Sequence, residues 1–369
     1  MNKMVYSERQ VFSMETTREK YFLAANSCEG FVSFFKDCYN ACDGWRAIII
    51  KGGPGTGKSS FMRYIATRAE ASGHRVILCP CSSDPNSLDA VIIEDIKLAL
   101  LDGTAPHVVE PEYAGVCEEI FNLGDFWDGA ALREKRADII TATRRNGALH
   151  KTASRYLSAC GQLLYDNLKI ARQCADFSRA TKAAHKAAQT LIPKSEGTPR
   201  EQIRFLSGIT PQGVVSYADT VDKHYTTKII IEDKFGAVST AFMNTVREIA
   251  LSRGYSIITL KSAFLPSELT DHVLIPELSL AFLTEHEYVT FNSDIRRMHA
   301  RRFYDNTALH GARSRTLFNR RVFRKLLDCA TKTLCSAKEA HDILEKFYVE
   351  QMDFDAATRA AEKLAEEIF

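Results

Sequence analysis

The chain of 369 residues is 45% hydrophobic and 25% charged, and its formal net charge is +2. This composition is that of a globular protein rather than a disordered one, and the length indicates two or three domains. The small net charge gives no overall reason to expect a nucleic-acid or membrane partner.

The chain begins without a targeting or membrane segment. Its first twenty residues, MNKMVYSERQVFSMETTREK, lack the apolar centre of a signal peptide. No later apolar run approaches the length needed to span a bilayer. We therefore expect a cytoplasmic protein.

A glycine-rich loop follows the apolar stretch at 47–51. Residues 52–59 read GGPGTGKS and match GxxxxGK[ST], and an amphipathic helix that ends near Gly73 comes next. Glycines let the loop amides point at phosphate oxygens, and the helix presents its positive N-terminal end. We expect ATP to bind here. The expected nucleotide ligands are Gly52, Gly53, Gly55, Thr56, Gly57, Lys58, Ser59 and Ser60.

Two residues are expected to serve a magnesium ion. Lys58 would reach the β and γ phosphates, and the Ser59 hydroxyl would hold Mg²⁺. Asp102 ends the run LALLD, which has the hhhhD form of a Walker B strand, and would hold the same ion through water. Gly103 follows, where many hydrolytic ATPases have a glutamate, so either the catalytic base lies elsewhere or hydrolysis is slow.

Asp84 and His107 are the candidates for that catalytic role. Asp84 lies in CSSDP after an expected strand, at the sheet edge where ligands bind in open α/β folds. The alternative for Asp84 is an Asp-Pro turn or a helix cap. His107 follows Asp102 within DGTAPH and is either a contact to phosphate or acceptor or a structural histidine.

The second half of the chain repeats the first. AIIIKGGPGTGKSSFM at 47–62 matches KIIIEDKFGAVSTAFM at 228–243, and further segments correspond in the same order. In the second copy Val238 replaces Gly57, Ser239 replaces Lys58 and Thr284 replaces Asp102; His107 falls opposite Tyr288 or Val289. We expect one working nucleotide site, in the first half, and a structural or regulatory second half.

Each half is predicted to be an α/β part followed by helices. The fold class is α/β, with a mainly parallel sheet of P-loop NTPase type, tandemly duplicated, and with long antiparallel helices after each half. Strands are expected near 22–25, 48–51, 76–81 and 97–101. The expected parts are a P-loop domain at 1–115, a helical hairpin at 116–192, a linker at 193–200, a degenerate P-loop-like domain at 201–292 and a C-terminal helical region at 293–369. The sequence leaves open whether each half closes its own sheet.

The chain resembles a bacterial family of uncharacterised tandem P-loop ATPases. The resemblance is carried by GGPGTGKSS, CSSDPNSLDAVII, LLDGTAPHV, NLGDFWD and the repeated DF helices, and it covers nearly the whole chain. It implies ATP binding, ATP hydrolysis and a P-loop NTPase fold. The loop DKFGAVST at 233–240 departs from members that carry two intact loops.

Basic residues concentrate between Arg296 and Lys325, where Asp305 is the single acid. Three interpretations stand: a nucleic-acid or acidic-partner surface, an arginine finger for the first site, and a solvated helix face, which the sequence favours. The leading functional hypothesis is a Mg²⁺-dependent ATPase that moves its helical arms or binds a protein partner through them. The alternatives are a small-molecule or nucleotide kinase with Asp84 as base, and a nucleotide-sensing scaffold with little turnover.

Overall fold

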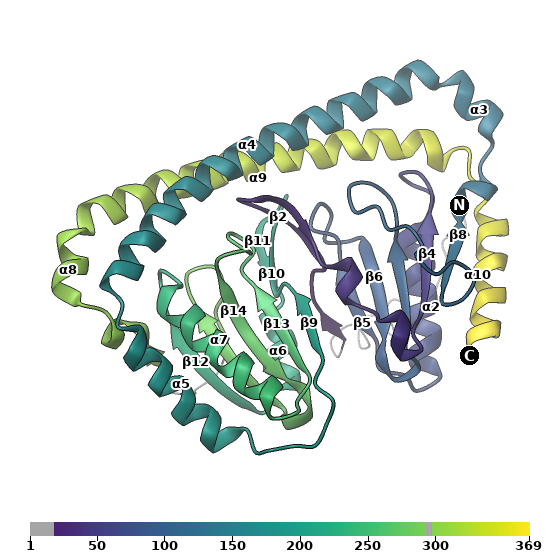
Figure 1. Ribbon diagram of the computed structural model, residues 1–369. Coiled ribbons are helices and arrows are strands. Elements are labelled where there is room, and N and C mark those ends of the chain that lie inside the picture. The colour runs from purple at the N-terminus through teal and green to yellow at the C-terminus, as the bar shows by residue number, and fades with distance from the viewer. Residues whose placement is uncertain (1–17, 293–294, 296) are drawn as a thin grey trace.

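The computed structural model describes residues 18–292, 295 and 297–369 (Figure 1). The N-terminal stretch 1–17, on which the expected absence of a signal peptide partly depends, lies outside these residues. So do the domain boundary at residue 293 and Arg296, the first residue of the basic run. Within the described residues the chain is of α/β class, with sheets that contain parallel pairs and with long helices.

The first half of the chain builds a mixed six-stranded sheet. Across the sheet the strands are β1 (Glu19–Lys20), β5 (Ile77–Pro80), β6 (Leu88–Ile93), β7 (Leu98–Asp102), β4 (Arg46–Lys51) and β8 (Glu118–Asn122). The pairs β1/β5, β4/β7 and β4/β8 are parallel, whereas β6 is antiparallel to both of its neighbours. The sequence analysis did not predict β6, because the periodicity of a short, fully buried apolar run does not distinguish a strand from a helix segment. It also did not predict β8, which extends the sheet past residue 115.

The second half builds a sheet with the same order of equivalent strands. They are β9 (Glu201–Arg204), β13 (Ile257–Lys261), β14 (Thr270–Ile275), β15 (Leu280–Glu285), β12 (Thr227–Glu232) and β16 (Met298–His299). Ile50 pairs with Asp102 in the first sheet, and Ile231 pairs with Thr284 in the second. The registers therefore make Thr284 the structural counterpart of Asp102.

A third, four-stranded sheet is shared between the halves. Its strands are β11 (Gly213–Ser216), β10 (Ser207–Thr210), β2 (Ala24–Ser27) and β3 (Gly30–Ser33). Beside it, Phe22 and Phe205 exchange two backbone hydrogen bonds of 2.9 Å, and both side chains are fully buried. One apolar core also contains residues of both large sheets, among them Ile49, Leu101, Ile230 and Leu283. Each half thus closes its own large sheet and contributes one hairpin to a common one.

Helices cover the large sheets and connect the halves. The α-helices are α2 (Lys58–Ala71), α3 (Gly129–Glu134), α4 (Arg136–Cys174), α5 (Phe177–Leu191), α6 (Ala218–His224), α7 (Ala237–Ser252), α8 (Asn306–Gly311), α9 (Arg313–Val349) and α10 (Phe354–Ile368). The 3-10 turns are η1 (Phe35–Asp37), η2 (Ala41–Asp43), η3 (Glu94–Ile96), η4 (Leu123–Phe126), η5 (Pro276–Leu278) and η6 (Ala300–Phe303). Within the described part of the chain, no helix is both long enough and apolar enough to cross a membrane.

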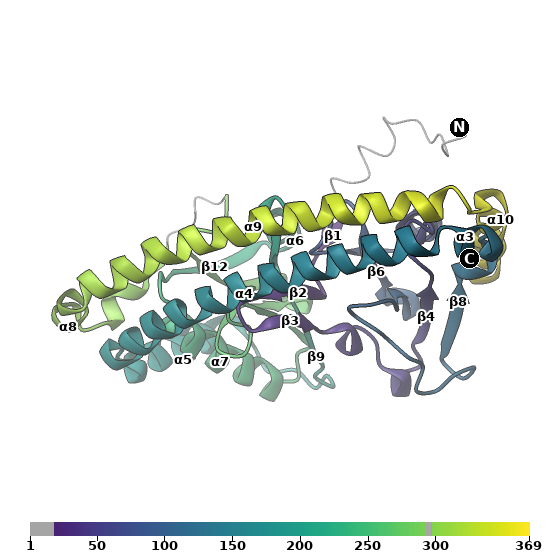
Figure 2. The same cartoon turned by 90° about the horizontal axis from the view of Figure 1, so that it is seen from above.

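The long helices pair between the halves rather than within them. We call α3, α4 and α5 the first arm, and α8, α9 and α10 the second arm. α4 and α9 lie side by side and run in opposite directions in both views (Figures 1 and 2). The prediction of a hairpin within 116–192 is therefore wrong, because α4 has its antiparallel partner in the other half.

Each arm ends on the opposite half. α5 of the first arm packs on α7, and α10 of the second arm packs on α2. Asp176 and Asp353 cap these terminal helices by accepting from the amides of Arg179 and Ala356. Small side chains repeat along the contact faces, which lets the helices approach closely. The buried residues are Ala180, Ala184 and Ala188 on α5, and Ala357, Ala361, Leu364 and Ala365 on α10.

Replacing Leu364 with alanine tests the exchange of arms. Leu364 is 8% exposed and belongs to a core formed with first-half residues such as Phe61 and Ile65. Its truncation should lower the free energy of unfolding by about 2–4 kcal/mol, through lost burial and the cavity left behind. Hydrogen exchange should also accelerate in α2, on the first half. Urea unfolding and exchange mass spectrometry measure both effects.

Leu317→Ala is the matched control, because Leu317 is 48% exposed on α9. Its effect on stability should be below about 0.5 kcal/mol. Unchanged exchange in α2 of the Leu364→Ala variant would contradict the docking of α10 on the first half.

Candidate functional site

The loop between β4 and α2 forms a cradle of backbone amides. Gly55 and Gly57 have φ angles of 70° and 88°, in the left-handed region that glycine adopts without strain. Gly57 is the N-cap of α2, so Lys58 begins the helix and the helix N-terminus faces the loop. Lys58 Nζ donates to the carbonyls of Gly52 and Gly53 at 3.3 and 2.9 Å, and Thr56 Oγ1 donates to Gly53 O at 2.9 Å. The predicted ligand residues thus share one tight turn.

Asp102 lies beside this loop because β7 is the neighbour of β4. Its Oδ2 atom is 3.8 Å from Lys58 Nζ. Its Oδ1 atom accepts from the amide and hydroxyl of Thr104 at 3.0 and 2.6 Å. Ser59, the residue after Lys58, accepts from the amide of Leu88 at 3.0 Å. The structure therefore brings Lys58, Ser59 and Asp102 to one edge of the sheet.

Asp89 is a residue of this edge that the sequence reasoning missed. It is buried at the start of β6, and its Oδ1 atom is 3.4 Å from Nε2 of His107, which is also buried. The His107 ring stacks on Phe35 with centroids 4.8 Å apart. Burial raises the pKa of Asp89 to about 6; nearby His107, a hydrogen bond with Cys81 and Lys58 lower it, and Asp102 raises it.

The repeat contains the signal that would have identified Asp89. Asp89 and Asp271 occupy equivalent positions in β6 and β14, since Ala90 pairs with Leu101 and His272 pairs with Leu283. Asp271 Oδ2 lies 3.8 Å from His286 Nε2 in the second half. The spatial counterpart of His107 is therefore His286, not Tyr288 or Val289 as the sequence alignment indicated. A gap in the loop after the strand caused that error.

Asp84 is held in a turn. Its carboxylate accepts from the amide of Asn86 at 3.1 Å and from the hydroxyl of Ser87 at 3.3 Å. Lys338 of the second arm lies 3.3 Å from the same carboxylate. These contacts match the turn interpretation of Asp84 and give the residue a role in joining the two halves.

The second arm covers the first loop. A Cβ atom on Gly53 would meet the Tyr348 ring at 2.8 Å, and one on Gly55 would meet the carbonyl oxygen of Glu345 at 2.8 Å. Gly53 is therefore needed for this close approach, and Gly55 is needed both for the approach and for its positive φ. A hydrogen bond from His341 is the main cause of the lowered pKa of Glu345, and the amide of Gly55 contributes. Glu345 thus lies directly against the cradle.

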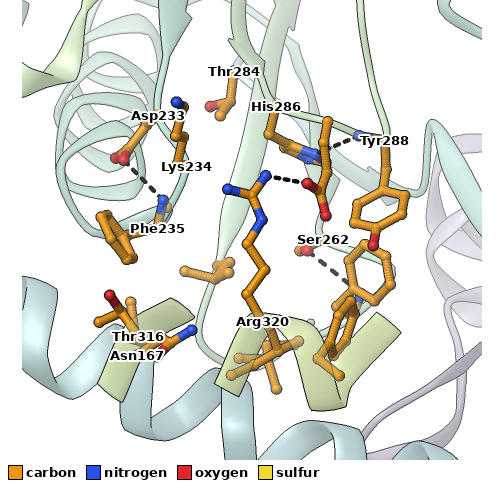
Figure 3. A pocket seen from close by; sticks show the side chains of 18 of the residues that line it. Asn167, Asp233, Lys234, Phe235, Ser262, Thr284, His286, Tyr288, Thr316 and Arg320 are labelled. Atoms are coloured by element: carbon orange, nitrogen blue, oxygen red, sulfur yellow. Dashed lines mark hydrogen bonds and ion pairs between the residues drawn. The ribbon is translucent and has the colours of Figure 1, made fainter. Parts of the chain in front are cut away.

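The equivalent cradle in the second half is filled by a side chain of its own loop. Asp233 replaces Gly52, and its buried Oδ2 atom accepts from the amides of Val238 and Ser239, both at 3.0 Å. Its Oδ1 atom accepts from the Phe235 amide at 3.1 Å (Figure 3) and from the Tyr304 hydroxyl at 3.1 Å. Burial is the main cause of the raised pKa of Tyr304, and Asp233 adds to it. A carboxylate therefore occupies the position of the expected anion.

No such group fills the first cradle. Among the described residues, no side chain accepts from the amides of Gly57 and Lys58, the counterparts of Val238 and Ser239. The described residues also contain no cluster of three or more histidine, cysteine or acidic side chains that could hold a metal. A metal here would therefore depend on Ser59, Asp102 and groups of a bound ligand.

The basic run lies mainly near the second half. Arg320 and Arg324 pair with Glu287, and Arg315 pairs with Asp166 of the first arm. These pairs join the arms to each other and to the second sheet. They agree with the helix-face interpretation, and the acidic partners lie after β15 of the second sheet and on the first arm.

Comparison of the chain with protein-family models, with curated proteins and with solved structures found no match. The resemblance to tandem P-loop ATPases therefore rests on the residues that carry it in the sequence. The chemistry of the site is likewise inferred from its own geometry.

Replacing Asp233 with alanine tests whether this carboxylate fills the second cradle. The change leaves two buried amides and the Tyr304 hydroxyl without their acceptor. The free energy of unfolding should fall by about 1–3 kcal/mol. Lys234→Ala is the control, because the adjacent lysine is exposed. Equal stability of the two variants in urea unfolding would contradict the role of Asp233.

The pH dependence of stability tests the burial of Asp89. Its pKa is about 6 in the folded protein, against an ordinary value of 3.8. Between these pH values the folded protein holds a proton that the unfolded chain has released. Relative to Asp89→Asn, the stability of the unmodified protein should therefore fall as pH rises from about 4 to 6, by roughly 1–3 kcal/mol.

Urea unfolding of both proteins at several pH values measures this difference, since the remaining titrating groups are common to both. Parallel stability curves across the window would show that Asp89 keeps its ordinary pKa.

Proposed function

We propose that the first half is a P-loop NTPase domain that binds Mg²⁺-ATP and hydrolyses it. The observation that carries this proposal is the contrast between the two cradles. In the second half the Asp233 carboxylate accepts hydrogen bonds from two amides of the loop. In the first half no described side chain accepts from the equivalent amides of Gly57 and Lys58, and the Lys58 side chain adds a positive charge. A cradle of this kind suits an external anion such as a triphosphate.

The roles of the residues follow from their positions. The amides of residues 53–60 and the Lys58 ammonium would hold the phosphates. Ser59 and Asp102 would hold Mg²⁺, Asp102 through water. When bound, the ion would neutralise charge that develops during phosphoryl transfer. The Lys58 ammonium and the Asp102 carboxylate lie 3.8 Å apart, and this ion pair would open to admit the phosphate and the metal between them.

Asp89 and His107 are the proposed route for the proton of the attacking water. A Cβ atom at residue 103 would clash with Ile49, which explains the absence of a glutamate there. His107 Nδ1 is buried and has no hydrogen-bond partner among the described residues, while the buried Asp89 carboxylate lies beside the Cys81 thiol. A carboxylate with a pKa of about 6 can accept a proton near neutral pH. The pair therefore combines free acceptor capacity with a suitable pKa.

The second arm is proposed to respond to the nucleotide. Glu345 lies beside Gly55, whose amide a phosphate would also need, and the two anions would repel each other. Phosphate binding would therefore favour an arrangement in which Glu345 leaves the loop. Nucleotide state and the position of α9 would then be linked, because each favours one arrangement over the other. A protein partner of the arms would sense the same change.

Two alternatives have separate support. The first is a kinase that transfers phosphate to a small molecule or nucleotide, which the missing glutamate after Asp102 favours. Its expected base is Asp84, and the carboxylate of Asp84 already interacts with Asn86, Ser87 and Lys338. A sensor with little turnover is favoured by the filled second cradle. A cytoplasmic location stays a prediction from the sequence, and the paired arginines do not favour a nucleic-acid partner.

Phosphate release by the purified protein with Mg²⁺-ATP tests the proposal and the alternatives together. Release without an acceptor supports the ATPase, transfer to an added acceptor supports the kinase, and tight binding with neither supports the sensor.

Lys58→Ala tests the site itself. The loss of a charge-assisted phosphate contact should weaken ATP binding by about 1.5–3 kcal/mol in calorimetry. Ser239→Ala, at the equivalent position of the filled loop, should bind ATP like the unmodified protein. Equal affinity of the Lys58→Ala variant would refute the site. A large loss in the Ser239→Ala variant would show instead that the second loop takes part.

A further inference from the structure

A cavity of about 440 Å³ lies beside the filled loop of the second half (Figure 3). Its lining combines the end of the second sheet with residues of α4, α8 and α9. It therefore lies at the position that corresponds to the nucleotide site of the first half. Since Asp233 occupies the phosphate cradle, a ligand here would have to bind next to the cradle rather than in it.

The floor of the cavity contains an unsatisfied buried hydroxyl. Thr284 is 1% exposed, lines the cavity, and its Oγ1 atom has no hydrogen-bond partner among the described residues. Thr284 is the counterpart of Asp102, so the acid that would hold a metal in the first half is replaced by a neutral group. An unpaired buried hydroxyl is costly, and a ligand atom would satisfy it.

The apolar part of the walls is made of leucine and aromatic side chains. They include Phe235, Phe264, Leu168, Leu265 and Phe323. Phe264 and Phe323 meet edge to face, with centroids 5.5 Å apart. Walls of this kind favour a ligand with an apolar, preferably aromatic, body.

The mouth of the cavity is positively charged. Lys234, Arg301 and Arg313 line it and are exposed, and none of the three forms an ion pair with a described acid. Arg301 donates to the side-chain oxygen of Asn306, which is neutral. The mouth therefore offers three cations that lack an anion.

The acids in the lining are fewer than its cations: Asp233, Asp271 and Glu287 stand against Lys234, Arg301, Arg313 and Arg320. The loop amides and Tyr304 engage Asp233, His286 engages Asp271, and Arg320 engages Glu287. The pKa of Glu287 is lowered to about 2, since the hydrogen bonds from Arg324 and Arg320 outweigh its burial. An anion at the mouth would thus meet a net positive charge.

We propose that this cavity binds a small organic anion. Its apolar or aromatic body lies against the phenylalanines, and its single anionic group lies between Lys234, Arg301 and Arg313. A triphosphate does not fit, because the Asp233 carboxylate holds the amides that it would need. This site is independent of the proposed nucleotide site in the first half.

Titration with 8-anilinonaphthalene-1-sulfonate, an aromatic sulfonate, tests the proposal. We expect saturable binding of one molecule per chain by calorimetry and fluorescence. The uncharged analogue N-phenyl-1-naphthylamine should bind at least about ten-fold more weakly, since it cannot pair with the cations. The double variant Arg301→Ala and Arg313→Ala should lose affinity for the sulfonate by a similar factor.

Two variants serve as controls. Arg321→Ala removes an exposed arginine of α9 that does not line the cavity, and should bind the sulfonate normally. Lys58→Ala should also bind it normally, which separates this site from the nucleotide site. The proposal is overturned if no saturable binding occurs, if the neutral analogue binds equally well, if the double variant keeps full affinity, or if Lys58→Ala abolishes binding.

Discussion

The exchange of arms between the halves is the constraint on which the structure depends. α4 and α9 pair along their lengths, and each leads to a terminal helix on the opposite half. One core contains residues of the first arm with the second sheet, and another contains residues of α10 with the first sheet. Neither half can bury its apolar surface alone. The two halves therefore fold as one unit, with both loops beneath the paired helices.

This arrangement places two similar loops in similar surroundings. The loops differ in whether a side chain of the loop itself accepts hydrogen bonds from its amides. At residue 52 a glycine leaves the amides of the cradle available, whereas at residue 233 an aspartate supplies a carboxylate from within the chain. An internal carboxylate is already held in place, so it pays no entropy of association when it binds the amides. The second half keeps the backbone of an anion site while its anion is covalently attached.

Much of the first site could be predicted from the sequence, because its parts are local or adjacent. Residues 52–59 form one turn, and Asp102 ends an apolar strand that becomes the neighbour of β4. Of the pair formed by Asp89 and His107, the sequence analysis predicted only His107 as a site residue. Asp89 lies within a run of apolar residues whose strand direction the sequence does not reveal, and only the antiparallel course of β6 brings its first residues to the ligand edge. The exchange of the arms was also missed, since helical periodicity identifies an apolar face but not the helix that covers it.

The sequence by itself determined the strand, loop and helix of the first site, the repeat, and the replacement of the loop lysine by Ser239 in the second copy. These depend on short-range backbone geometry and on residue identity, which the order of amino acids contains directly. Tertiary structure alone decided that the second arm covers the first loop, that Asp233 fills its own cradle, and that His286 rather than Tyr288 pairs with Asp271. Each of these depends on contacts between groups brought together by packing, and such contacts form only when the whole chain has folded.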